Sequence, residues 1–163
     1  MFVLRFTQTL LKDMKITPAE DAHGPSLFSW HANITKLNNR KHIIFVNDSS
    51  RLSVIIDGIR TAQLPKLIGI FSTTLLEYLK SEGIESKLID TYMKDGQEKI
   101  TICKTNDRSV LGTMKEITLF STSIDRIDRN YESMKWLNRV IRKPINYNEP
   151  INVFKDEIEK SYL

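Results

Sequence analysis

The sequence predicts an α+β domain: a mainly antiparallel sheet built from hairpins, covered by helices, with a helical C-terminal third. Two segments have the pattern of hairpins, residues 43–56 and residues 88–103. An amphipathic helical pattern over residues 64–79 separates them, and further helical patterns follow residue 106. Neighbouring hairpins pair antiparallel, whereas a doubly wound parallel sheet needs regular alternation of strands and helices.

The first forty residues predict a strand, a short helix, a loop and a second helix. Residues 2–7 alternate with a period of two, which indicates a strand, and a short helix to about Met14 is expected next. Prolines and glycine in residues 17–26 predict a loop, which we expect to be mobile. The apolar residues of 27–37 then indicate a helix that ends near Asn38.

The middle of the chain predicts two hairpins around a helix. The apolar run 43–46, the turn residues 47–50 and the alternation in 52–57 predict the first hairpin, with its first strand buried on both faces. The helix over 64–79 has Pro65 in its first turn and Gly83 just beyond its end. The dipeptide Asp95-Gly96 favours a tight turn between strands 88–92 and 99–103.

The last third predicts three helices. The first is capped by Asn106 or Asp107, the second runs from about residue 128 to 143 and ends before Pro144, and a short third follows Pro150. No repeat or linker divides the chain, so residues 1–163 are expected to form one domain. Residues 144–163 are interpreted as a C-terminal arm or a partner contact.

Composition indicates a cytoplasmic protein. The chain has 24 Lys and Arg against 20 Asp and Glu, a formal charge of +4, which permits nucleic-acid binding without requiring it. A lone cysteine, Cys103, excludes an internal disulfide and a thiolate metal cluster and favours a reducing compartment. No apolar run is long enough to cross a bilayer, and the N-terminus lacks the pattern of a signal peptide.

The sequence lacks the common catalytic motifs. It contains no phosphate-binding loop, dinucleotide fingerprint, zinc-peptidase motif or esterase elbow. The histidines are not spaced as metal ligands on one helix; they are His23, His31 and His42. No metal and no cofactor are therefore predicted.

The segment from Ser29 to Asn33 brings an aromatic ring, an imidazole and an amide together. His31 could act as a general base, with Asn33 or Arg40 orienting a substrate oxygen. The alternative, which we favour, is that Trp30 fills the core and His31 holds a backbone carbonyl.

Cations gather before the buried strand of the first hairpin. Arg40 and Lys41, with Lys36 nearby, could neutralise phosphates. Charged side chains at a sheet edge also discourage the addition of another strand. Both interpretations stay open.

The segment from Asn106 to Gly112 has two interpretations. Asp107 or Ser109 can cap a helix, Arg108 can project from its first turn, and free backbone N–H groups there could bind an anion. Gly112 lies inside the expected helix, where glycine costs about 1 kcal/mol relative to alanine. A helix start that faces a ligand, or tight packing of the helix on the sheet, would explain a glycine at this position.

The expected helix from 128 to 143 carries a basic face with an aromatic residue at its margin. Its candidate binding residues are Lys135, Trp136, Arg139 and Arg142. Cations that follow phosphates and a ring that stacks on bases suit single-stranded nucleic acid. The alternative is a solvated helix whose terminal cations complement its dipole.

Several segments together resemble the pattern of a bacterial domain of unknown function, over the chain up to about Phe120. They are L-R-F-T-Q-T-L-L, L-F-S-W-H-A-N-I, N-R-K-H-I-I-F-V-N-D, L-S-V-I-I-D-G-I and D-R-S-V-L-G-T-M. The resemblance implies a short, stand-alone cytoplasmic protein, without an activity, substrate or cofactor. Lys115 and Glu116 depart from the asparagine and acid of that pattern, which puts in doubt a role for the exposed side of this helix.

Two functions follow from these residues. The first is a non-catalytic cytoplasmic module that binds nucleic acid or a protein partner through the basic helix and the Arg40–Lys41 edge. The alternative is a small hydrolase or phosphodiesterase-like enzyme with His31 as base and residues 107–109 holding an anionic substrate. The alternative requires His31 to lie near Asp107 in one concave site. The sequence leaves the oligomeric state open.

Overall fold

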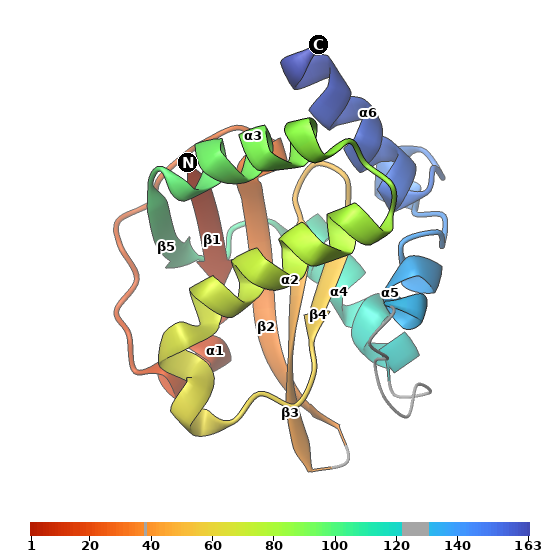
Figure 1. Cartoon of the computed structure of the whole chain (residues 1–163). Helices are drawn as coiled ribbons and strands as arrows, with labels where there is room; N and C mark the ends of the chain where they lie inside the picture. The colour runs from red at the N-terminus through yellow and green to blue at the C-terminus, as the bar shows by residue number, and fades with distance from the viewer. Residues whose placement is uncertain (38, 122–130) are drawn as a thin grey trace.

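The computed structural model describes residues 1–37, 39–121 and 131–163. It contains a five-stranded sheet of order β4-β3-β2-β1-β5 (Figure 1). The strands are β1 (Phe2–Phe6), β2 (Ser29–Leu37), β3 (Arg40–Asn47), β4 (Ser53–Ile56) and β5 (Ile100–Lys104). β1 pairs parallel with both of its neighbours, whereas β2, β3 and β4 pair antiparallel. The α+β class is confirmed, but the sheet is mixed rather than mainly antiparallel.

Helices cover both faces of the sheet, with α2 and α3 in front and α4 behind in Figure 1. The α-helices are α1 (Gln8–Met14), α2 (Leu67–Ser81), α3 (Ser86–Gln97), α4 (Arg108–Ser121), α5 (Glu132–Leu137) and α6 (Pro150–Tyr162). Short 3₁₀ turns lie at Ser26–Phe28, Thr61–Lys66 and Lys143–Ile145. The opening strand, the first hairpin and the helices now labelled α1, α2, α4 and α6 agree with the sequence prediction. None of the described helices has the length and apolar composition needed to span a membrane.

The helix predicted for residues 27–37 is wrong: residues 29–37 form β2, and Asn38, near which the helix was expected to end, lies outside the described residues. Trp30, Ala32 and Ile34 recur with the period of two of a strand and face the main core, and the residues between them face the opposite side. Because β2 pairs in parallel with β1 and antiparallel with β3, this one strand makes the sheet mixed.

The second predicted hairpin is also wrong: residues 86–97 form α3, and β5 pairs in parallel with β1. The apolar residues of this segment share one helical face, and they are Leu88, Ile89, Tyr92 and Met93. Gly96 allows α3 to approach the sheet, because a Cβ there would lie 2.2 Å from Cζ of Phe2. The glycine that suggested a turn therefore serves as a close contact between a helix and the core.

The helix predicted for residues 128–143 is shorter than expected. Residues 128–130 lie outside the described part of the chain, and α5 ends at Leu137. The next side chain, Asn138, is buried and accepts hydrogen bonds from the N–H and hydroxyl of Ser53 at 2.8 and 2.9 Å. It also donates to the Ser53 carbonyl and to the Tyr78 hydroxyl, both at 2.9 Å. These contacts hold the chain against β4 where the helix ends.

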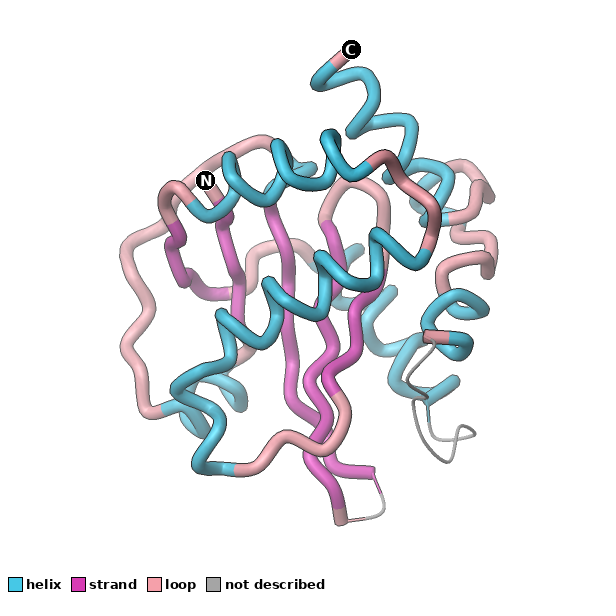
Figure 2. The backbone as a smooth tube through the Cα atoms, in the orientation of Figure 1, coloured by secondary structure: helices cyan, strands magenta, loops and turns pink. Residues whose placement is uncertain are grey.

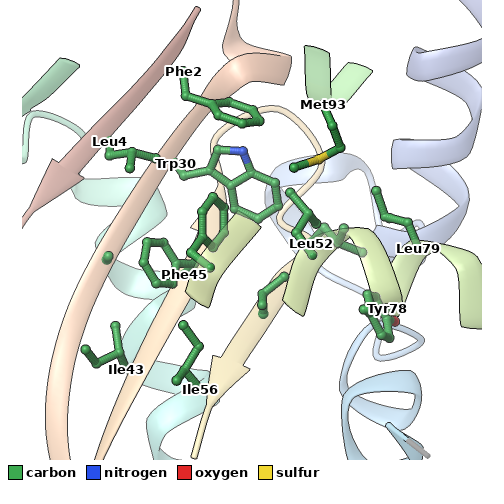
Figure 3. Close-up of a cluster of buried hydrophobic side chains, with 14 of the residues drawn as sticks. Phe2, Leu4, Trp30, Ile43, Phe45, Leu52, Ile56, Tyr78, Leu79 and Met93 are labelled. Atoms are coloured by element: carbon green, nitrogen blue, oxygen red, sulfur yellow. The ribbon is translucent and has the colours of Figure 1, made fainter. Parts of the chain in front are cut away.

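The main core lies between one face of the sheet and the helices α2, α3 and α6. Trp30 lies at its centre, with Phe2 and Phe45 on neighbouring strands (Figure 3). The Trp30 ring N–H donates to the Tyr92 hydroxyl at 3.2 Å, which satisfies a buried polar group. Phe154 of α6 contributes to the same core. A smaller cluster on the opposite face lies under α4, and its members are Ile44, Val46, Ile55, Val110, Met114, Ile117 and Leu137.

The predicted loop after α1 is present and runs past the outer edge of β5 (Figure 2). Its Ala19 N–H donates to the Ile102 carbonyl at 2.8 Å. The buried Arg5 donates to Asp21 at 2.7 Å and to the Ala22 carbonyl at 2.6 Å. This guanidinium holds the pKa of the Asp21 carboxyl below its usual value. The mobility expected for the loop stays a prediction.

Candidate functional site

His31 lies beside the start of α4, as the hydrolase alternative requires. Its Nε2 accepts a hydrogen bond from the Asn106 backbone N–H at 3.2 Å, and its Nδ1 lies 2.7 Å from the Asp48 carboxylate. The N–H donation to Nε2 assigns the ring proton to Nδ1. His31 is fully buried, so neither nitrogen is available to a substrate in this arrangement. Its catalytic role stays a prediction that requires the imidazole to be freed.

The start of α4 has the geometry of a capped helix. The Asp107 carboxylate accepts hydrogen bonds from the N–H groups of Ser109 and Val110 at 2.9 and 3.2 Å. Asp107 therefore accepts from two of the backbone N–H groups that we expected to bind an anion. Arg108 is exposed beside it. A Cβ at Gly112 would meet nothing within 4 Å, so tight packing does not explain this glycine.

Arg51 is a polar residue of this region that the sequence analysis did not identify. It is buried, with a left-handed φ of 63°, and donates to the Asp48 carbonyl and, at 2.9 Å, to the Ser109 hydroxyl. Burial lowers the pKa of Arg51, against the attraction of Asp107 and Asp48. The side chain ties the β3–β4 turn to α4. A cation directly after turn residues was the only sequence signal for it.

The residues assigned to the basic helix do not form an open basic surface. Arg139 donates to Glu82 at 2.7 and 2.9 Å, and Arg142 donates to Glu116 at 3.0 Å. The hydrogen bond to Glu82 raises the pKa of Arg139. Lys135 is half-buried. A nucleic-acid interface along this segment therefore loses the geometry on which it depended.

Trp30 and Asn33 have structural contacts. Trp30 is fully buried in the main core. The Asn33 carbonyl oxygen accepts from the Thr7 hydroxyl at 2.6 Å and from the Ile34 N–H at 2.9 Å. These contacts join β2 to the start of α1, and a binding role for either residue stays a prediction.

Arg40 and Lys41 line a cavity of about 500 Å³ at the β2–β3 end of the sheet, which we call the Arg40 pocket. Its lining residues are Asn39, Arg40, Lys41, Gly58, Ile59, Arg60 and Thr61. The Arg40 side chain is 54% exposed and lies 3.4 Å from the Asp57 carboxylate. The Lys41 ammonium lies 3.8 Å from Asp13 and 3.4 Å from the Thr61 hydroxyl. Arg60 is exposed and adds a third cation, which the sequence analysis missed.

The strand register concentrates positive charge beside this pocket. Lys41 lies directly opposite Lys36 on β2, and Arg40 follows at the next pair. Like charges placed opposite each other destabilise a sheet, so the arrangement carries a cost. Gly58, with a φ of 66°, leaves space for the Arg40 guanidinium, because a Cβ there would lie 2.3 Å from Nη2. Arg60 reaches the pocket because the Ile59 N–H donates to the Lys41 carbonyl at 3.0 Å.

A family model described as a domain of unknown function, DUF6933, matches residues 3–153. The chain belongs to the DUF6933 family. Family membership confirms the resemblance at the level of an uncharacterised domain, and it assigns no activity to the chain. No curated protein and no solved structure matches the chain. Within the described part of this DUF6933 chain, no three His, Cys, Asp or Glu side chains lie close enough together to hold a metal ion.

Proposed function

We propose that this chain is a non-catalytic binding module that recognises a phosphate-bearing ligand at the Arg40 pocket. The observation that carries the proposal is the convergence of Arg40, Lys41 and Arg60 on one cavity of about 500 Å³. Guanidinium and ammonium groups are the usual protein partners of phosphate oxygens. Cys103 is a buried free thiol, which favours the reducing cytoplasm as the compartment.

The pairing of these cations supports an anionic ligand. The Arg40–Asp57 and Lys41–Asp13 separations are 3.4 and 3.8 Å, longer than a usual charge-assisted hydrogen bond. Loosely paired and partly exposed cations can change partner at low cost, since exposed ion pairs contribute little stability. A phosphate group that reached the pocket would gain contacts from two or three cations.

The lining of the pocket defines what it can recognise. None of the described residues that line it is aromatic, so these residues offer no surface on which a base can stack. Contacts from cations alone read phosphate groups and carry no base sequence. We therefore expect a nucleic-acid strand, if it is the source of the phosphates, to bind without strong sequence preference and with strong salt dependence.

The test is fluorescence polarisation with labelled single-stranded RNA, single-stranded DNA and duplex DNA over a salt series. The Arg40→Ala/Lys41→Ala variant should bind more weakly, and the slope of log affinity against log salt should fall by about 2 because two phosphate contacts are lost. The control variant, Lys80→Ala/Lys87→Ala, removes the same charge from exposed positions on α2 and α3 and should bind like the wild type.

Competition with inorganic triphosphate distinguishes the sources of phosphate. Binding of a nucleic-acid strand that triphosphate then displaces supports phosphate recognition. Triphosphate that raises the melting temperature of the wild type but not of Arg40→Ala/Lys41→Ala, without strand binding, supports a small phosphorylated ligand. If no strand and no triphosphate binds at low salt, or if both double variants lose binding equally, the proposal is wrong.

A further inference from the structure

We propose that a second surface, separate from the Arg40 pocket, docks an acidic segment of a partner protein. This Trp136 surface consists of Phe120 on α4, Trp136 on α5, and Arg142 after α5. Figure 1 shows α5 beside the C-terminal end of α4. The Phe120 and Trp136 rings lie 5.7 Å apart, and Cζ of Arg142 lies 6.0 Å from the Phe120 ring centroid.

Large apolar side chains are exposed on this surface. Trp136 is 54% exposed and Phe120 is 39% exposed. An exposed Trp is enriched at protein interfaces because it buries a large area with little loss of conformational freedom. Adjacent exposed apolar side chains with a polar rim are typical of protein interaction sites.

Arg142 determines the charge of the partner. Its side chain is 3% exposed, and only Nη1 has a hydrogen-bond partner, the Glu116 carboxylate. The Nε and Nη2 groups are buried without a partner. A buried N–H group without an acceptor is costly, and a carboxylate would satisfy both groups in the bidentate geometry of an arginine–carboxylate pair.

The position of the Phe120 ring explains how a carboxylate reaches these groups. The ring lies against the guanidinium, and the Phe120 side chain is itself 39% exposed. In the proposed complex the Phe120 ring turns aside, and a carboxylate that arrives over Trp136 takes its place at the guanidinium. The occupant is therefore an acidic segment that carries an apolar side chain for Phe120 and Trp136.

Selection from a random 12-residue peptide library on the immobilised full chain identifies a probe. The library is first depleted against the Trp136→Ser variant. We expect the enriched peptides to combine Asp or Glu with a large apolar residue. Enrichment of neutral or basic peptides, or of none, would contradict the proposal.

A labelled peptide from that selection then tests the surface residue by residue. Trp136→Ser should raise its Kd at least tenfold, whereas Leu163→Ser, which removes an exposed apolar side chain at the C-terminal end of α6, should leave the Kd unchanged. A peptide with Asn and Gln in place of its acids should not bind. Arg142→Gln should also weaken binding. Circular dichroism of the Arg142→Gln and Arg142→Lys variants shows whether each is still folded, so that a lost contact can be told from unfolding.

Two further outcomes decide between occupants and between sites. Light scattering that detects a dimer, lost on Trp136→Ser, would replace the partner protein with a second copy and overturn the proposal. The Arg40→Ala/Lys41→Ala variant should bind the peptide like the wild type, so failure of the phosphate proposal leaves this one intact. Equal loss of peptide binding in that variant would show nonspecific attraction of an acidic peptide to a basic protein.

Discussion

Replacement of Gly96 by alanine should destabilise the protein, although alanine is the better helix former. The added Cβ would lie 2.2, 2.4 and 2.5 Å from three ring atoms of Phe2, where ordinary contact begins at 3.4 Å. Phe2 is fully buried in the main core, so α3 or the ring must move by about 1.2 Å. Such overpacking costs about 3 kcal/mol, and the helix propensity of alanine recovers about 1 kcal/mol. We expect a net loss of about 2 kcal/mol.

Urea denaturation followed by circular dichroism measures this loss, and a matched glycine provides the control. Gly112→Ala lies inside α4 with open space around its Cβ, so it should stabilise the protein by about 1 kcal/mol. In a Phe2→Leu background, which removes the ring, Gly96→Ala should cost much less than in the wild type. A midpoint for Gly96→Ala equal to or above that of the wild type would refute the contact between α3 and β1.

Two further predictions concern the buried polar groups. Burial would raise the pKa of Glu82, but hydrogen bonds from Arg139 and Tyr78 outweigh burial and lower the pKa. The ionised form of Glu82 therefore stabilises the fold above the unfolded pKa of about 4.3, and this stability is lost as the pH falls through the pKa of the folded state. The difference in unfolding free energy between the wild type and Glu82→Gln should therefore shrink from pH 7 to pH 3, and a difference that stays constant contradicts the pairing. His31→Ala removes the acceptor of the Asn106 N–H and should cost about 2 kcal/mol. Hydrogen exchange should accelerate at the Asn106 amide more than at the Ile117 amide within α4, and equal changes at the two amides would count against the contact.

The sequence predicted the elements whose period was unambiguous. The alternation of residues 2–6 and the run from Ile43 to Val46 identified two strands, and the pattern of residues 64–79 identified α2. It failed at β2, because the apolar spacing of residues 27–37 fits a helix as well as a strand. Pairing with β1 and β3 decides between them, and that pairing is tertiary. The turn predicted at Asp95-Gly96 was wrong for a similar reason, because glycine is favoured both in tight turns and where a helix packs closely against the core.

The candidate site was predictable only where its residues lie close together in the chain. Arg40 and Lys41 are adjacent, and the sequence identified both as candidates for phosphate binding. Arg60 comes to the same pocket only because the segment after β4 returns along β3. The partner of Arg139 lies 57 residues away, at Glu82, so local patterning could not show that this cation is neutralised. Local charge counts overestimated the basic surface for that reason.

The contacts at the two edges of the sheet limit how a partner can bind. At β4, the side-chain amide of Asn138 both accepts from and donates to the backbone of Ser53, much as a residue of a neighbouring strand would. At β5, the Ala19 N–H occupies the Ile102 carbonyl. A visiting strand would have to displace these groups before it could extend the sheet. Addition of a partner strand is therefore opposed at one point on each edge of the sheet.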